Sequence, residues 1–262
     1  MLIDSHVHLA SYDSKEVSEI VRRASDADVE VIITASTTVE SSRRSVELAH
    51  IYPTVYAGIG IHPNRLREPL ALDAYDTLRE LAMSSARVVA ISETGLDFFP
   101  NAPDLGRQEE AFRLQLRLAG EFGLPVNWHS QVPEPGVQGR HGETLRILWE
   151  EDAGEFGGVM HYFQADEATA WAAIECGFYI SYSKTLLRHP HLPEVARRIP
   201  LEHVVLETDA GPQPWKENRE DWTEPKDIPL IAERLAELKG VTVEEVARVT
   251  TANLRSLHRL DG

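Results

Sequence analysis

The stretch Asp4-Ser5-His6-Val7-His8, which reads DSHVH at residues 4–8, organises the interpretation of the whole chain. It follows a short apolar start, Met1-Leu2-Ile3, which predicts a first buried strand. Because side chains alternate between the faces of a strand, His6 and His8 point the same way, about 7 Å apart, and could hold one metal ion. Asp4 lies on the same face and could orient one imidazole. The alternative is a pair of surface histidines. A metal site requires that later strands bring further ligands to the same place.

Apolar, β-branched segments recur along the chain and predict a parallel sheet, because they are continuous hydrophobic runs, as expected when both faces are covered. The predicted strands are Leu2–Asp4, Val29–Ala35, Val55–Ile61, Val88–Ser92, Pro125–Asn127, Gly158–Met160, Phe178–Ser181 and Val204–Glu207. Segments with the helical apolar period lie between them. Strands alternating with helices in this way predict an α/β fold, a (β/α)8 barrel, with residues 1–262 forming a single domain. An open doubly wound sheet is the alternative, although no GxGxxG motif follows the first strand.

Composition excludes several classes of protein. The chain has 42 acidic and 26 basic residues, a net charge of −16, which argues against a protein that coats nucleic acid nonspecifically. It does not exclude an enzyme that grips one phosphate with metal ions. Cys176 is the only cysteine, which fits a reducing cytoplasm. We expect no signal peptide and no membrane association, because the chain has neither a long apolar run nor a basic leader. We also expect no obligate protein partner.

Imidazole and carboxylate side chains recur where the predicted strands end. They are His62, Glu93, His129, His161 and Asp209, after or at the ends of the third, fourth, fifth, sixth and eighth strands. Any one of them could simply cap a turn. A barrel, however, brings the carboxyl ends of all its strands to one rim, so we expect these side chains to converge with His6 and His8. A set of histidines with two carboxylates, and with Asp4 beneath, indicates a centre for two divalent ions such as Zn, Mn or Mg.

Two loops rich in Pro, Gly and charge follow the fifth and eighth strands, at Ser130–Glu143 and Ala210–Pro225. In a barrel they would rise from the rim that carries the active site. We interpret the remaining histidines as surface or structural residues, with His141 as the exception, because its loop overhangs the predicted site.

The sequence resembles the TatD-like metal-dependent hydrolases of the amidohydrolase superfamily over essentially its whole length. The matching pieces are DSHVH at 4–8, GIHP at 60–63, SETGLDF at 92–98, LPVNWHS at 124–130, HYF at 161–163, ISYS at 180–183, IPLEHVVLETD at 199–209, EP at 224–225 and TTANLRSL at 250–257. The resemblance implies a (β/α)8 barrel and a metal-dependent hydrolase, with deoxyribonuclease as the expected activity.

The resemblance also implies roles by position. His6, His8 and Asp209 resemble the ligands of a first metal ion, and His129 and His161 those of a second, with Glu93 as the bridging carboxylate. His62 resembles the family's histidine beside the bound phosphate. We expect Asp209 to accept the proton of the attacking water, so that Asp209, Glu93 and His62 are the expected catalytic residues.

The chain departs from the family in the two loops. Gln131 stands where the family usually has arginine. Ala210–Trp215 replaces the SPYLAP-type segment that usually follows the aspartate of the eighth strand. We expect Arg140, Lys184, Lys216 or Arg219 to supply the missing charge to a substrate. Trp215 and Trp222 could stack on bases, which is how single strands are held without sequence reading, or could pack the loop on the barrel.

The expected reaction is phosphodiester hydrolysis of DNA, of the 3′–5′ exonuclease type, assisted by two divalent ions. The main alternative is hydrolysis of another ester or an amide, for example an aminoacyl-tRNA ester or a lactone. A non-catalytic barrel is the third hypothesis; it predicts eroded ligands, and none of the six is lost.

Overall fold

The computed structural model describes residues 1–133 and 140–260. Within them, eight parallel strands form one sheet in which each strand pairs with the next in chain order. The strands are β1 Leu2–Val7, β2 Val29–Thr34, β3 Val55–Ile59, β4 Val88–Asp97, β5 Val126–Gln131, β6 Gly158–Met160, β7 Phe178–Tyr182 and β8 Val204–Leu206.

The sheet closes on itself between β1 and the segment that follows β8. Val7 pairs with Ala210, and the backbone N–H of His8 donates to the carbonyl of Ala210 at 2.7 Å. The N–H of Asp209 donates to the carbonyl of His6 at 3.0 Å. The predicted (β/α)8 barrel is confirmed, and the alternative of an open doubly wound sheet is wrong because the two edges meet.

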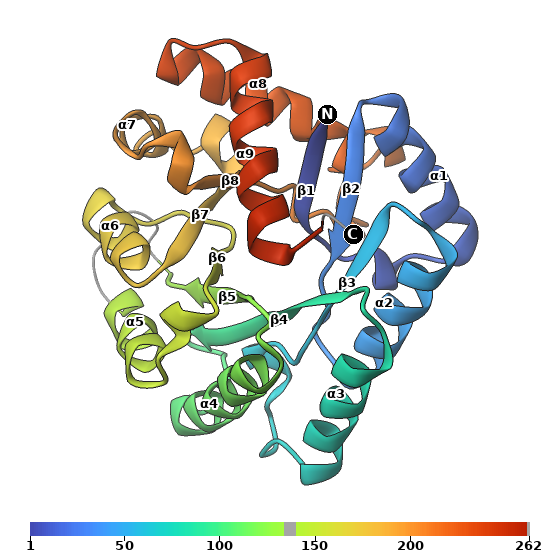
Figure 1. The fold of residues 1–262 in the computed structure, drawn as a ribbon, viewed down its shortest axis with the longest axis vertical. Helices are drawn as coiled ribbons and strands as arrows, with labels where there is room; N and C mark the ends of the chain where they lie inside the picture. Colours follow the sequence, from blue (N-terminus) through green and yellow to red (C-terminus); the bar gives the residue numbers. More distant parts are fainter. Residues whose placement is uncertain (134–139, 261–262) are drawn as a thin grey trace.

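Helices cover the outside of the barrel (Figure 1). They are α1 Ser14–Asp26, α2 Val39–Ile51, α3 Leu72–Ser84, α4 Leu105–Phe122, α5 His141–Glu150, α6 Glu167–Glu175, α7 Leu192–Arg198, α8 Ile228–Lys239 and α9 Val243–His258. Side-chain caps fix several helix starts, since Asp13 accepts from the N–H of Glu16 and Thr242 from that of Glu245. None of the helices in the described part of the chain is long and apolar enough to cross a membrane.

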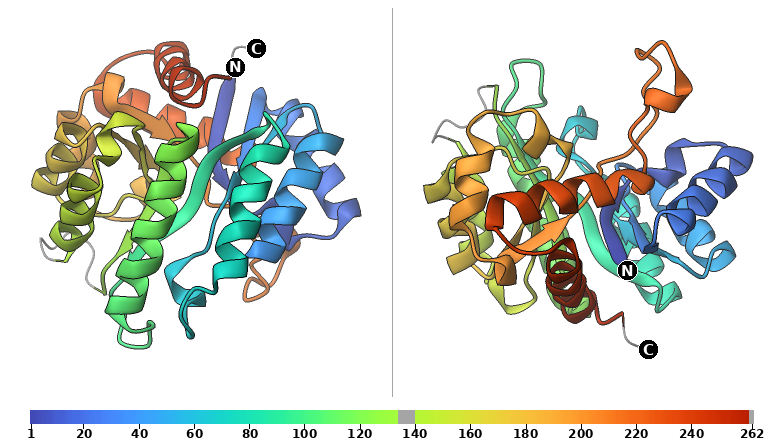
Figure 2. Two further views of the ribbon diagram at one scale, coloured as in Figure 1. Left: turned by 60° about the horizontal axis from the view of Figure 1, so that its bottom comes forward. Right: turned by 90° about the horizontal axis from the view of Figure 1, so that it is seen from above.

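The amino-terminal end of the barrel is closed by an apolar plug. Side chains that include Ile3, Val31 and Val205 form a buried cluster with Leu254 and Leu260. Figure 1 shows α9, which carries Leu254, crossing this face of the barrel. The opposite, carboxyl-terminal end is therefore the one left for polar side chains and loops. Figure 2 shows the segment after β8, in orange, projecting from the body of the barrel.

Three strands run well past the end that the apolar pattern predicts. β1 continues to Val7, β4 to Asp97 and β5 to Gln131, so that His6, Glu93 and His129 lie within strands. Apolar periodicity ends a strand at its first polar residue, but polar side chains can stay buried at a barrel mouth where they contact one another. In the predicted loop after β5, residues 134–139 lie outside the described residues, and α5 already begins at His141.

Candidate metal centre

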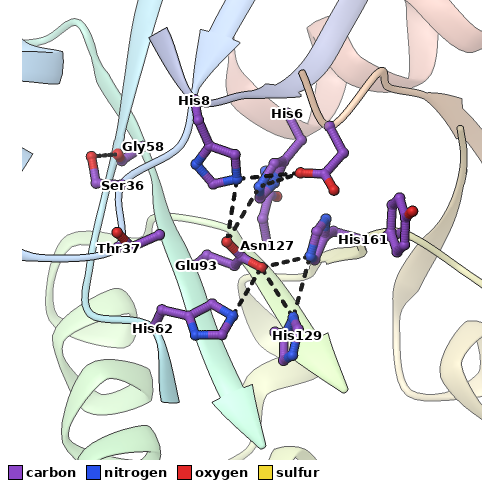
Figure 3. A network of polar contacts seen from close by, with 12 residues as sticks. His6, His8, Ser36, Thr37, Gly58, His62, Glu93, Asn127, His129 and His161 are labelled. Carbon is purple, nitrogen blue, oxygen red and sulfur yellow. Dashed lines mark hydrogen bonds and ion pairs between the residues drawn. The ribbon is translucent and has the colours of Figure 1, made fainter. Parts of the chain in front are cut away.

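The structure brings the six predicted ligands and His62 together at the carboxyl-terminal mouth of the barrel (Figure 3). They are delivered by strands or by residues that follow strands closely: His6 on β1 and His8 after it, His62 after β3, Glu93 on β4, His129 on β5, His161 after β6 and Asp209 after β8. Side chains far apart in the chain become neighbours because every parallel strand ends at this rim.

The two carboxylate oxygens of Glu93 face different sets of histidines. Its Oε2 lies 3.6 Å from Nε2 of His6 and 3.6 Å from Nε2 of His8. Its Oε1 lies 3.0 Å from Nδ1 of His129 and 2.8 Å from Nε2 of His161. Figure 3 shows Glu93 between the two sets. This carboxylate can therefore contact two ions at once, one on each oxygen.

Asp209 extends the set that contains His6 and His8. Its Oδ1 lies 3.2 Å from Nε2 of His8 and 3.9 Å from Nε2 of His6. Burial opposes its ionisation, but the hydrogen bond from His8 and the nearby positive imidazoles outweigh it, so the pKa of Asp209 stays below its usual range. Its side chain is a quarter exposed, which opens it to molecules entering the mouth.

Two buried carboxylates that the sequence analysis missed contact the second pair of histidines. Oε1 of Glu207 lies 3.5 Å from Nδ1 of His161 and accepts a hydrogen bond from the N–H of Tyr162 at 2.5 Å. Oδ2 of Asp97 lies 3.4 Å from Nε2 of His129. A carboxylate behind an imidazole fixes its orientation and raises its basicity toward a metal. Both residues lie in quoted motifs, in the ETD and GLD triplets, and that position was the available signal.

His62 differs from the other histidines in its tautomer. Its Nδ1 accepts a hydrogen bond from the backbone N–H of Asn64 at 3.0 Å. Burial lowers its pKa, so the ring is neutral and its proton is on Nε2, which lies 3.3 Å from Oε1 of Glu93. Nε2 therefore carries the N–H donor and lies beside Glu93, near enough to Glu93 and His129 for a shared ion, and the His62 ring lines the cavity at the mouth. His62 is therefore suited to contact a substrate oxygen.

The donor set fits divalent ions. Both ring nitrogens of His6 are buried without a hydrogen-bond partner, which is costly unless something else binds them. Within the described residues, three groups of His and Glu side chains have ligand atoms within 4.8 Å of one another, and His6, His8 and Glu93 form one of them. Imidazole and carboxylate ligands suit Zn, Mn and similar ions. The residues therefore fit a metal centre.

The electrostatics of the cluster lead to the same conclusion. Burial opposes ionisation of Glu93, but the neighbouring imidazoles of His62, His161 and His129 hold its pKa well below the usual range. Burial likewise opposes protonation of His161, yet Glu93 and Glu207 raise its pKa well above the usual range. The buried carboxylates therefore favour positive charge beside them, and a bound cation would supply it as a protonated imidazole does.

The centre opens into a cavity of about 610 Å³. Its wall contains His8, His62, Glu93, His129, His161 and Asp209, together with Arg65, Arg67, Gln131 and Tyr162. The two arginines come from the segment after β3, directly beyond His62. Sequence analysis missed them, although their place just after the GIHP motif indicates a rim position.

Of the predicted substrate contacts, His62 lies in this wall, whereas Arg140, Lys184 and Trp215 do not. Lys184 pairs with Asp227 at 2.6 Å, and Arg140 pairs with Glu143 at 3.2 Å. Trp215 is 75% exposed and does not line the cavity. The structure does not bring these three side chains into the cavity wall, because loop position alone does not determine where a long side chain points.

The remaining loop candidates are engaged as well. Nζ of Lys216 donates to the carbonyl of Asp221 at 2.6 Å, and Arg219 pairs with Glu224 at 2.7 Å. Trp222 lies against Tyr12 and under the Arg219 guanidinium, so it packs the loop on the barrel.

Asp4 and His141 also differ from expectation. The carboxylate of Asp4 accepts from the N–H of Thr208 at 2.9 Å and from its hydroxyl at 2.5 Å, and it contacts the backbone of His6. Asp4 therefore ties β1 to the segment after β8, and Glu207 and Asp97 orient imidazoles in its place. Burial raises the pKa of Asp4 to about 8. His141 is buried and contacts the Ser130 hydroxyl at 2.8 Å, in a small pocket beside His129 and His161.

A parallel barrel with a buried imidazole and carboxylate cluster at its carboxyl-terminal mouth is typical of metal-dependent hydrolases. The model of the family described as TatD related DNase matches residues 3–259. The chain belongs to this family, and the resemblance noted from its motifs is confirmed.

Known relatives are similar over nearly their whole length. The uncharacterized metal-dependent hydrolase YcfH of Escherichia coli K12 is 34% identical, covering 99% of this chain and 96% of that protein. Deoxyribonuclease TATDN3 of Homo sapiens is 29% identical, covering 98% of this chain and 94% of that protein. The crystal structure of YJJV, a TatD homologue of E. coli K12, superposes with a TM-score of 0.87 at 28% identity, covering 98% of each chain. The protein is a metal-dependent hydrolase that acts on ester bonds.

Proposed function

We propose that the protein is a deoxyribonuclease of the 3′–5′ exonuclease type with a centre of two divalent ions, Zn, Mn or Mg. In this proposal His6, His8 and Asp209 hold one ion, His129 and His161 hold the other, and Glu93 bridges them. One observation carries the proposal: the two carboxylate oxygens of Glu93 face different pairs of histidines. Oε2 faces His6 and His8, and Oε1 faces His129 and His161.

Each side chain then has a defined task. Two ions held in this way would acidify a water molecule and stabilise the charge that develops on phosphate oxygens. Asp209 is our candidate for the proton acceptor, since its carboxylate is ionised and partly exposed to the cavity. His62 donates from Nε2 to a phosphate oxygen, because Asn64 holds its Nδ1 as an acceptor.

We also propose that residues 1–262 form one catalytic domain. A cytoplasmic location stays a prediction.

One observation favours the alternative, hydrolysis of a different ester or an amide. Gln131 contributes a neutral amide to the cavity wall beside His129, where a phosphodiester substrate would be served better by a cation. A nuclease remains the better match to the whole cavity, because Arg65 and Arg67 line it as well.

Metal analysis of the purified protein combined with a substrate panel tests the proposal. Single-stranded DNA labelled at its 5′ end is incubated in EDTA and in Mg, Mn or Zn. The proposal predicts two ions per chain and metal-dependent shortening of the strand from its 3′ end, abolished by EDTA. Cleavage of aminoacyl or lactone esters with the DNA left intact would favour the alternative.

A further inference from the structure

Two arginines in the wall of the catalytic cavity have no side-chain partner among the described residues. Arg65 and Arg67 take part in no ion pair and no side-chain hydrogen bond within residues 1–133 and 140–260. By contrast, arginines on the outer helices are held by carboxylates, such as Arg113 by Glu109 and Glu150. The chain has 42 acidic residues, yet none of those that the structure describes pairs with Arg65 or Arg67.

The backbone that carries these arginines is fixed, so that only the guanidinium groups are free. Leu66, between them, is 3% exposed and anchors the segment in the core. The side-chain amide of Asn64 donates to Oδ2 of Asp97 at 2.7 Å, and the Arg107 guanidinium donates to the carbonyl of Arg67. A binding group on a fixed backbone loses less entropy when it meets its ligand.

The charge of the surrounding wall explains what these groups are suited to bind. The inner part of the cavity contains Glu93 and Asp209, whose carboxylates repel an approaching polyanion. Arginine presents a fork of donors that matches phosphate oxygens and keeps its charge at any working pH. A neutral lactone or a simple ester would gain nothing from two such groups.

We propose that Arg65 and Arg67 form an anion subsite that binds a phosphate of the substrate other than the one being cleaved. The inference rests on the proposed phosphodiesterase function and deepens it. Both arginines are exposed at the outer rim, whereas Glu93 is 4% exposed at the bottom of the site. The substrate is then a strand with at least two phosphodiesters, which runs outward past the segment after β3.

The test compares two substrates of the metal-loaded enzyme. Bis-para-nitrophenyl phosphate has a single phosphodiester and reaches only the metal centre, whereas a single-stranded DNA oligonucleotide also reaches the rim. The double variant Arg65→Gln/Arg67→Gln should raise KM for the oligonucleotide roughly tenfold with little change in kcat, and leave KM for the small substrate within about twofold. The salt dependence of oligonucleotide binding, measured by fluorescence anisotropy in Ca²⁺, should lose about 0.7 from its logarithmic slope, the value for one phosphate on a single strand.

A matched control removes the same charge elsewhere. Arg22→Gln/Arg248→Gln removes two arginines paired with Asp26 and Glu245 on outer helices, and it should leave both KM values unchanged. Equal losses on both substrates would overturn the subsite, since the arginines would then act at the cleaved phosphate; no loss on the oligonucleotide would overturn it too. If the wild-type enzyme cleaves neither substrate, the proposed function itself fails.

Discussion

Replacing Glu207 by glutamine tests whether a buried carboxylate tunes one half of the metal centre. Glu207 is fully buried, and its Oε1 both faces Nδ1 of His161 at 3.5 Å and accepts from the N–H of Tyr162 at 2.5 Å. Glutamine keeps the shape and the acceptor for Tyr162 but removes the negative charge behind the imidazole. Loss of such a partner weakens metal binding by about 10- to 100-fold, or about 1.4–2.7 kcal/mol.

The location of Glu207 makes the prediction specific. Only the ion held by His161 and His129 should weaken, because Oε2 of Glu93 and the side chains of His6 and His8 are untouched by the change. Titration of the apoprotein with Mn²⁺ by isothermal calorimetry should therefore resolve one weakened and one unchanged class of site. Asp97→Asn, behind His129, should weaken the same class. Equal weakening of both classes, or of neither, would refute the reasoning, provided that circular dichroism shows the variant folded.

Three further predictions concern stability. The buried ring of His258 has its pKa lowered to about 4 by burial, while the unfolded chain has about 6.5, so the unfolded state binds more protons between these values. The free energy of unfolding should therefore keep its full contribution from His258 above pH 6.5 and lose about 3 kcal/mol of it as the pH drops toward 4. In urea unfolding, the His258→Gln variant should show a smaller loss over the same pH range. Gly95→Ala should prevent folding or cost more than about 4 kcal/mol, because its φ is +139° and a Cβ would lie 2.0 Å from the carbonyl oxygen of His129; soluble yield and thermal unfolding check this. Leu254→Ala should cost about 2–5 kcal/mol in urea unfolding by opening a cavity in the plug, and an unchanged midpoint would contradict the role of α9.

The sequence predicts the fold and the metal cluster for the same reason. Each strand is an apolar run buried on both faces, and the polar residue that ends each run is carried to the rim by the parallel topology. His129 and His161 could therefore be placed beside Glu93 without coordinates. The lengths of β1, β4 and β5 could not, because a buried polar residue inside a strand breaks the apolar pattern.

Long-range pairing limits what the sequence can predict about the rim. Lys184 is neutralised by Asp227, which lies 43 residues further along the chain. Arg65 and Arg67 have no side-chain partner in the described part of the chain, and Leu66 is buried between them, an arrangement that depends on how the segment folds. Glu207 looks like the last residue of a strand, and its role needs the position of His161, 46 residues away in the chain, to become visible. Such partners are set by tertiary packing and not by local pattern.

Anomalous diffraction from crystals grown with Mn²⁺ tests the central claim most directly. We predict two anomalous peaks that both contact Glu93, one also bound by His6, His8 and Asp209, and the other by His129 and His161. A single peak away from Glu93, or a peak coordinated by His62 in place of His161, would contradict the account.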